Sequence, residues 1–379
     1  MSQYEYYEFQ AVDRPLTVAE MRELRGYSSR AQITPTGFSV DYSWGSFKGD
    51  EDAWMERYFD AFLYLANWGT RVLKLRLPAR LLDPEVAEAY FGGEVAAIRR
   101  TADHIVLSFV LEDDEGYEWI EAEGVLASLV SVRAELAHGD LRALYLAWLL
   151  QAQRGELDDD EPEPPVPPGL GQLSVSLQSL AEFLQIDDNL LAICAEASAP
   201  LDDRGLDRDE VRAWIGRLAA GEKDDILTSL VADGDHTRVL ELQRRFQAER
   251  SARTGTPASR ARTVGELLEA AEAHADERAR IAAEERAREK ARRAREAKTA
   301  REKHLDSLVG SEGRLWAQID SFIATKQPKG YDQTVKLLVD LRDLAARTGG
   351  GDFELRLADL RMTHARKPSF LERLQKAGL

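Results

Sequence analysis

The sequence predicts an α+β N-terminal domain, followed by a mostly α-helical region with one long charged helix and a small C-terminal helical bundle. Three observations lead to this prediction. Segments with alternating apolar side chains are mixed with helical segments before residue 155. Residues 263–308 contain almost only strong helix formers, and four short helical segments separated by Gly or Pro follow them. The length of 379 residues suits two or three domains.

Residues 1–155 are expected to form the α+β domain. Residues 4–12 read as an aromatic strand, and residues 38–44 and 73–77 alternate apolar with polar side chains as half-buried strands do. A wide apolar band over residues 52–68 predicts one long helix that is buried against the sheet. The irregular mixture of strands and helices favours a mostly antiparallel or mixed sheet with helices packed on it.

The acidic, Pro-rich residues 156–169 are expected to form a solvated linker, because prolines favour extended backbone and like charges repel one another. Helical patterns then fill residues 170–255 and residues 310–379. The second of these regions is expected to form a small bundle, with one tetratricopeptide-like hairpin and its cap. Together with the long helix at residues 263–308, these segments complete the predicted domain organisation.

The long helix has a well-marked start. Thr263 and Glu266 have the spacing of a capping box, and the only glycine of the segment, Gly265, lies in the first turn. At about 1.5 Å per residue, such a helix would extend for roughly 70 Å. Its apolar seam consists of Ile281 and several alanines, which is too thin for a stable coiled coil. We therefore expect a single exposed helix, or one that leans on its own domains.

The second half of this helix is basic, although the chain as a whole is acidic. The net charge of the chain is −17, whereas residues 286–303 contain nine Lys and Arg and three Asp and Glu, a net of +6. Such a segment could bind phosphate backbones or an acidic partner. Two other interpretations are a solvated helix stabilised by ion pairs four residues apart, and docking on the protein's own acidic surface. The candidate anion or nucleic-acid contacts are Arg286, Arg288, Arg292, Arg293, Arg295, Lys298 and Arg301.

No catalytic, cofactor-binding or metal-ligating residue is predicted. The six histidines form no HxxxH pair, and the single cysteine, Cys194, reads as a small buried hydrophobe in an apolar helix. No phosphate-binding loop, dinucleotide fingerprint or nucleophile motif appears. An enzyme would need a dispersed site, and the N-terminal aromatic side chains would either line its pocket or fill a core. These aromatic residues are Tyr4, Tyr6, Tyr7, Phe9, Trp44, Trp54, Tyr58 and Phe59.

Two parts of the chain resemble known families. The first third resembles an uncharacterised bacterial family in the stretches YEYYEFQAVDRPL, WGSFKGD and ERYFDAFLYLANWG. The last fifth, from Tyr331 to Leu379, is similar to the helical tail of some bacterial SWIM-zinc-finger proteins. This resemblance implies a shared helical module without zinc, because the zinc-binding pattern needs several cysteines and the chain has one. It carries over no functional residue.

The lack of catalytic motifs and the long helix suggest a non-enzymatic interaction or adaptor protein, with partners held by the N-terminal domain and the C-terminal helical module. One alternative is a nucleic-acid-associated factor that binds phosphate backbones through residues 286–303. The other is an enzyme with a dispersed site in the aromatic N-terminal domain. The sequence begins without a signal-peptide pattern, and no apolar run reaches the ~20 residues of a membrane span. We therefore expect a bacterial cytoplasmic protein with no membrane partner.

Overall fold

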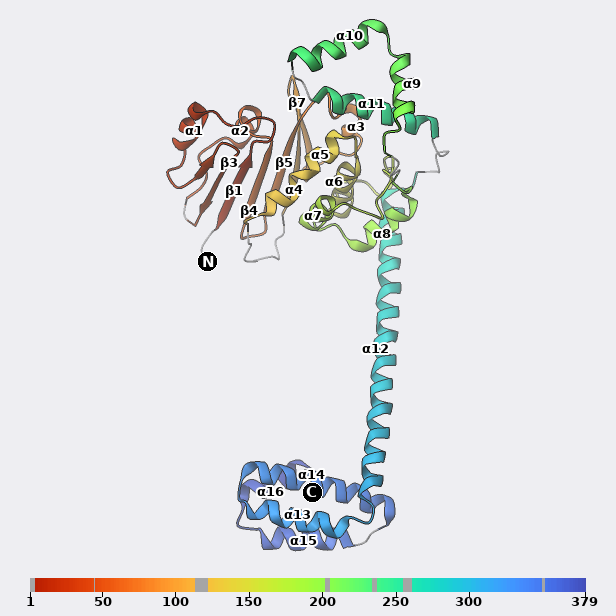
Figure 1. Cartoon of the computed structure of the whole chain (residues 1–379). Helices are drawn as coiled ribbons and strands as arrows, with labels where there is room; N and C mark the ends of the chain where they lie inside the picture. Colours follow the sequence, from red (N-terminus) through yellow and green to blue (C-terminus); the bar gives the residue numbers. More distant parts are fainter. Residues whose placement is uncertain are drawn as a thin grey trace. The chain divides into compact units, whose positions relative to one another are not determined.

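The structure, a computed structural model, describes residues 4–43, 45–112, 122–201, 205–233, 237–254, 261–349 and 352–379. The chain divides into an N-terminal unit, Met1–Glu277, and a C-terminal unit, Arg278–Leu379. The predicted fold class is confirmed. A seven-stranded antiparallel sheet region is followed by helical segments that include the long helix α12 (Val264–Leu308) and a C-terminal helical set (Figure 1).

The sheet has the strand order β2-β3-β1-β4-β5-β7-β6, and each neighbouring pair is antiparallel. Phe9 of β1, the strand next to the central β4, lies opposite Phe38 of β3 on one side and Phe62 of β4 on the other. The strands are β1 (Glu5–Gln10), β2 (Gln32–Thr34), β3 (Gly37–Tyr42), β4 (Ala61–Ala66), β5 (Arg71–Pro78), β6 (Ala96–Arg100) and β7 (His104–Leu111).

The two faces of the sheet contribute to different cores. Successive side chains of a strand point to opposite faces, so β4 sends Leu63 into one core and Phe62 into the other. The core around Leu63 is closed by α4, α5 and α6, and the core around Phe62 is closed by α1 and α2. The helices of this region are α1 (Val18–Arg25), α2 (Glu51–Arg57), α3 (Pro84–Glu88), α4 (Val125–Leu129), α5 (Ser131–Ala137) and α6 (Arg142–Gln153).

Short-range side-chain bonds fix where several of these helices begin. The Glu20 N–H donates to the Thr17 hydroxyl at 3.2 Å, and the Thr17 N–H donates to the Glu20 carboxylate at 2.7 Å. This reciprocal pair is a capping box, and α1 begins directly after it. The side chains of Asp50 and Asp83 accept backbone N–H groups at the starts of α2 and α3 in the same manner.

The predicted helix over residues 52–68 is wrong in its second half. Helix α2 ends at Arg57, and the chain continues as strand β4. Asp60 marks the change, because its N–H donates to the Gln10 carbonyl and its carbonyl accepts the Arg76 N–H, each at 2.8 Å. Strand β4 is buried on both faces, so its apolar residues form an unbroken run. Such a run has no period that distinguishes a buried strand from a buried helix.

Residues 156–169 differ from the solvated linker that their composition suggests. Glu163 is buried, and its carboxylate accepts hydrogen bonds from Arg262 at 2.7 and 2.8 Å and another from the Tyr145 hydroxyl. The Glu163 N–H also donates to the Arg262 carbonyl at 2.8 Å. An acidic segment can pack in this way because a cation from elsewhere in the chain compensates its inward carboxylate. We call residues 156–169 the packed segment.

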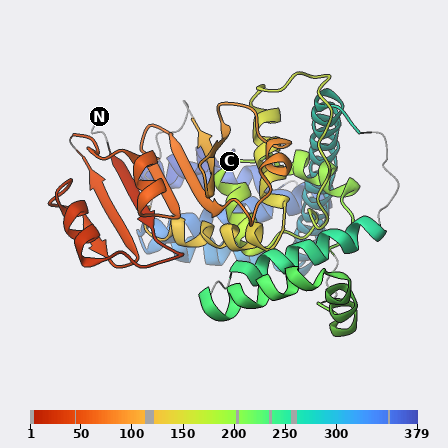
Figure 2. The same cartoon turned by 90° about the horizontal axis from the view of Figure 1, so that it is seen from above.

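The helices on either side of the packed segment share one core. Tyr145, Leu177, Cys194 and Leu267 all belong to the hydrophobic cluster that contains Leu63. The predicted regions 1–155 and 170–255 are therefore joined in one unit, which also includes the first turns of α12. Helices α9, α10 and α11 lie together on one side of that unit, in green in Figures 1 and 2. The helices after the packed segment are α7 (Val175–Phe183), α8 (Asp188–Ala197), α9 (Arg208–Arg217), α10 (Ala220–Thr228), the π-helical turn η1 (Ser229–Asp233) and α11 (Thr237–Thr254).

The C-terminal unit is a small helical bundle on the end of α12. Ile319, Leu338 and Phe370 are buried at its centre. The end of α12 is attached to α14, where Asp340 accepts bonds from Arg301 and, at 2.9 Å, from the His304 ring. The bundle helices are α13 (Glu312–Ala324), α14 (Pro328–Thr348), α15 (Asp352–Thr363) and α16 (Pro368–Lys376). None of the helices in the described ranges combines the length and apolar character that a membrane span requires.

The packed segment yields a stability prediction. Glu163→Ala leaves the Arg262 guanidinium and the Tyr145 hydroxyl without their acceptor, so we expect the N-terminal unit to lose about 3 kcal/mol of unfolding free energy. Amide hydrogen exchange in α6 measures this loss. The control is Glu88→Ala, which removes the exposed ion pair with Arg100 and should change the unfolding free energy by no more than about 0.5 kcal/mol. A loss at Glu163 as small as that of the control would contradict the packing described above.

Candidate functional site

An apolar cavity lies among α9, α10, η1 and α11. These helices surround a cavity of about 420 Å³, which falls within the usual range of ligand pockets. Two of its lining residues are polar, Lys223 and Gln243, and the others are apolar. We call this cavity the docking groove. Its lining residues are Leu206, Val211, Trp214, Ile215, Leu218, Lys223, Ile226, Leu227, Leu230, Val239, Leu242, Gln243 and Phe246.

Each wall of the docking groove contributes side chains with the same helical spacing. In each of the three walls the lining residues follow the pattern i, i+3, i+4 and i+7, which places them on one face of the helix. The first wall runs from Val211 to Leu218, the second from Lys223 to Leu230 and the third from Val239 to Phe246. The i, i+3, i+4 and i+7 spacing of each wall can be read from the sequence. Periodicity alone does not show that the three helices face one another.

The docking groove has a closed side and an open side. On the closed side, Trp214, Ile226 and Phe246 are buried. Ion pairs tie the walls together on that flank, between Arg245 and Glu222 at 2.8 Å and between Arg217 and Glu249 at 3.7 Å. On the open side, Ile215, Leu227 and Val239 are 44%, 58% and 40% exposed.

Cations border the open side. Arg208 and Arg212 are four residues apart on α9, and Ile215 follows three residues later, so the three side chains share one strip of the helix. Both arginines are exposed. Lys223 lines the groove itself, and its ammonium group donates to the Gly216 carbonyl at 3.3 Å. Within the described residues, no ion pair occupies any of these three cations.

The seven basic candidates of the sequence lie on α12 but do not form one face. At about 100° per residue, Arg286 lies roughly opposite Arg288 and Arg295, with Arg292 and Lys298 between them on the two sides. A polyanion along one side of the helix would therefore meet only part of the set. All of these residues except Arg301 are exposed.

Several of these cations already have partners. Glu289 accepts from Arg292 at 2.9 Å and from Arg293 at 2.8 Å, which is the spacing expected of a self-stabilised solvated helix. Arg301 is bound to Asp340 and, at 2.7 Å, to Asp343 of α14. Arg301 therefore attaches α12 to the bundle.

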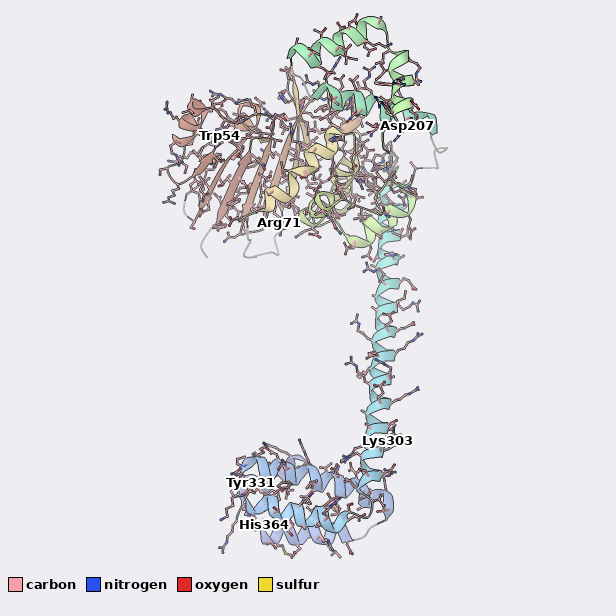
Figure 3. All side chains as sticks on the ribbon, in the orientation of Figure 1. Trp54, Arg71, Asp207, Lys303, Tyr331 and His364 are labelled. Carbon is pink, nitrogen blue, oxygen red and sulfur yellow. The ribbon has the colours of Figure 1, made fainter. Side chains whose placement is uncertain are left out.

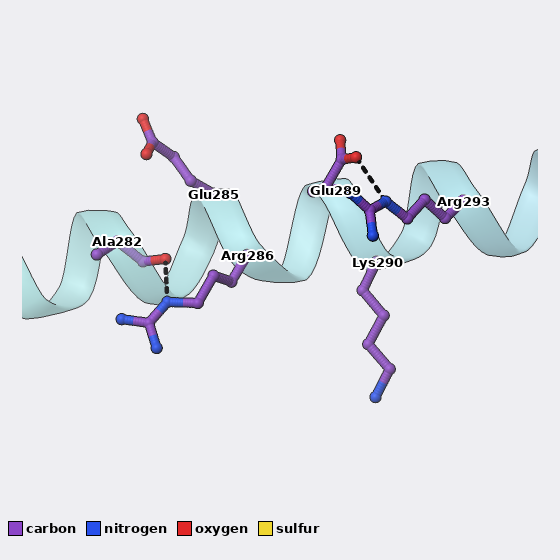
Figure 4. A pocket seen from close by; sticks show the side chains of 6 residues that line it. All are labelled: Ala282, Glu285, Arg286, Glu289, Lys290 and Arg293. Carbon is purple, nitrogen blue, oxygen red and sulfur yellow. Dashed lines mark hydrogen bonds and ion pairs between the residues drawn. The ribbon is translucent and has the colours of Figure 1, made fainter.

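Figure 4 shows the middle of this basic stretch. The Arg286 Nε donates to the Ala282 carbonyl at 3.2 Å, and Arg293 turns toward Glu289. The shallow depression beside these side chains is lined entirely by residues of α12 itself, so it has one wall. A surface of this kind encloses no ligand.

The N-terminal aromatic side chains fill a core. Phe9, Trp54 and Phe59 are almost completely buried, and the ring centroids of Phe9 and Phe62 are 4.5 Å apart. Tyr7 and Tyr58 are buried with them, while Tyr4 and Tyr6 are half-buried. Trp44 lies outside the described residues. The core interpretation therefore accounts for the described members of the set except Tyr4, which belongs to neither hydrophobic cluster.

Cys194 lies in a buried polar cluster rather than in a reactive site. Its side chain is hydrogen-bonded to Tyr145, which in turn donates to Glu163. Burial, the largest effect, raises the pKa of the Cys194 thiol to about 11, against a smaller lowering by the Tyr145 hydrogen bond. At neutral pH the group is therefore a thiol and not the nucleophilic thiolate.

The described residues contain no group of three or more His, Cys, Asp or Glu side chains arranged to hold a metal ion. Comparisons of the chain with protein-family models, with curated proteins and with solved structures found no match. The two resemblances drawn from the sequence remain predictions.

The thiol cluster gives a chemical prediction. We expect Cys194 to resist a disulfide reagent such as DTNB in the folded chain at neutral pH, because the side chain is fully buried and protonated. In denaturant the same chain should release one equivalent of chromophore, which serves as the control for the thiol itself. Rapid reaction of the folded chain would instead identify Cys194 as an accessible nucleophile.

Proposed function

We propose that the chain is a non-enzymatic interaction protein, and that the docking groove holds an amphipathic helix of a partner protein. The observation that carries the proposal is the open apolar groove, in which Ile215, Leu227 and Val239 remain exposed beside a cavity with apolar walls. Contiguous exposed apolar side chains are characteristic of interaction sites. The proposal places the partner on residues 206–246, which differs from the two partner sites expected from the sequence.

A helix suits this groove better than an extended peptide does. An extended peptide gains affinity by pairing its backbone with an exposed strand edge, whereas every wall of the groove is helical. A bound helix inserts side chains at i, i+3, i+4 and i+7. That spacing matches the spacing of the lining residues on each wall, so the side chains of a fourth helix can interdigitate with them.

Three cations near the open side favour an acidic partner, and one exposed carboxylate, Asp224, lies three residues before Leu227 on α10 and offsets part of their charge. These three cations lack ion-pair partners among the described residues: Arg208, Arg212 and Lys223. Carboxylates beside the apolar stripe of the bound helix would serve as their partners. Such pairs at the rim contribute mainly to selectivity and to the rate of association. The partner is therefore an amphipathic helix whose apolar stripe is bordered by Asp or Glu.

Of the expectations from the sequence, the proposal keeps the cytoplasmic location and gives less weight to nucleic-acid binding by α12. A chain with one cysteine has no intramolecular disulfide, which suits a reducing compartment, and we retain the bacterial cytoplasm as the proposed location. Nucleic-acid binding through residues 286–303 has less support, since the cations point to all sides of α12 and Arg301 is engaged with α14.

A pair of synthetic peptides tests the proposal. Both carry leucines at i, i+3, i+4 and i+7, but one stripe is bordered by Glu and the other by Lys. We expect the Glu-bordered peptide to bind the full chain, and the Lys-bordered peptide to bind at least roughly tenfold more weakly, because the three rim cations attract one and repel the other. Fluorescence anisotropy of the labelled peptides gives both dissociation constants.

The groove variant for this test is Leu227→Glu. It places a carboxylate within an apolar contact and should weaken binding of the Glu-bordered peptide by more than roughly tenfold. Val175→Glu is the matched control, because Val175 is 81% exposed on α7 and does not line the groove. Equal binding of the two peptides, or binding that survives Leu227→Glu, would refute the proposal.

A further inference from the structure

The charge of the chain is divided between its two units. Residues 278–379 contain 23 Lys and Arg and 15 Asp and Glu, a net of +8, which leaves −25 for residues 1–277. The basic character of the C-terminal unit therefore extends beyond α12 into the bundle.

Four cations lie in two turns of the bundle. Lys326 and Lys329 are in and directly after the turn from α13 to α14, and Arg366 and Lys367 are in the turn from α15 to α16. Lys326, Lys329 and Arg366 are exposed, and Lys367 is partly exposed. We call these four residues the turn patch.

The fold holds the two turns next to each other. The Lys367 ammonium group donates to the carbonyl of Ile323, at the end of α13, at 3.4 Å. Behind the turns, the Tyr331 ring of α14 packs on the Phe370 ring of α16, with centroids 5.3 Å apart. Figure 3 shows Tyr331 and His364 at the same end of the bundle, away from Lys303 on α12.

Little nearby acid offsets the turn patch. Among the described residues, no carboxylate forms an ion pair with any of its four cations. Asp332, one turn into α14, is engaged by Arg373 at 2.7 Å. Burial and the charge of Lys367 lower the pKa of His364, against a smaller opposing effect of Asp320. This histidine therefore adds less positive charge to the patch than a free imidazole would.

Two helices also begin at this patch. Helix α14 starts at Pro328 and α16 at Pro368, and in neither case does a side chain cap the first backbone N–H groups. The N-terminal end of a helix carries partial positive charge, which adds to the field of the four cations.

We propose that the turn patch binds the phosphate backbone of duplex nucleic acid without regard to sequence. Tyr331 and Phe370, the aromatic residues beside the patch, are buried and cannot stack on bases. Lysines and arginines bind the phosphates of the backbone. Without side chains that contact the base edges, such contacts position a protein on nucleic acid but carry no sequence information. The surface is separate from residues 286–303 and from the docking groove, and the proposal does not depend on either.

Salt-dependent binding of the full chain to a labelled random-sequence DNA duplex tests the proposal. The patch variant combines Lys326→Gln, Lys329→Gln, Arg366→Gln and Lys367→Gln. We expect it to bind at least roughly tenfold more weakly at low salt, and the slope of log affinity against log salt concentration to fall by roughly 2 to 4. The matched control removes four exposed cations of α12 through Lys290→Gln, Arg288→Gln, Arg295→Gln and Lys298→Gln, and should keep most of the affinity and slope.

A smaller variant guards against loss of folding. Lys329→Gln with Arg366→Gln changes two exposed side chains and should reduce the slope by roughly 2 while the unfolding temperature stays unchanged. Three results would each overturn the proposal. They are an equal loss in the α12 control, the absence of duplex binding by the unaltered chain, and binding to vesicles of anionic phospholipid without binding to the duplex.

Discussion

The ion pair between Glu163 and Arg262 determines how the N-terminal unit is closed. These residues are 99 positions apart, and the chain between them forms α7 to α11 before it returns to the packed segment. An antiparallel bridge between Pro162 and Thr263 continues the closure, and the first turns of α12 then complete the core with Val264 and Leu267. A buried carboxylate is costly unless a cation and donors surround it, so this pair fixes one arrangement of the segment.

The helices between Glu163 and Arg262 are packed unevenly. Helices α7 and α8 place side chains such as Leu177 and Leu190 in the main core, whereas α9, α10 and α11 enclose a cavity above three buried side chains. Small helical groups with few buried contacts open more readily than a main core does, and binding surfaces come from such regions. The docking groove is therefore a site that the fold leaves incomplete, which supports the proposal that a partner helix binds there.

Local signals made much of the fold predictable, and distant pairings account for what was missed. The capping boxes at Thr17 and Thr263 depend on residues three positions away, and both are present. Strand β4 was misread because burial on both faces removes its alternation. The packing of Glu163 depends on Arg262, far along the chain. The stripe of α11 was visible in the sequence, but its meeting with α9 and α10 was not. The number of Lys and Arg residues in the C-terminal unit could likewise be read from the sequence, whereas only the fold brings Lys326 beside Lys367.

We propose that a partner helix occupies the docking groove in the cell. Photo-crosslinking in the native host, with p-benzoylphenylalanine in place of Leu227, tests it most directly, because the reactive group samples only what lies at the open side of the groove. Mass spectrometry of the product then identifies the attached residue. We expect attachment within a segment of another protein that has apolar residues at i, i+3, i+4 and i+7 bordered by Asp or Glu. Attachment only to a lipid or other small molecule, or no product at all, would contradict it.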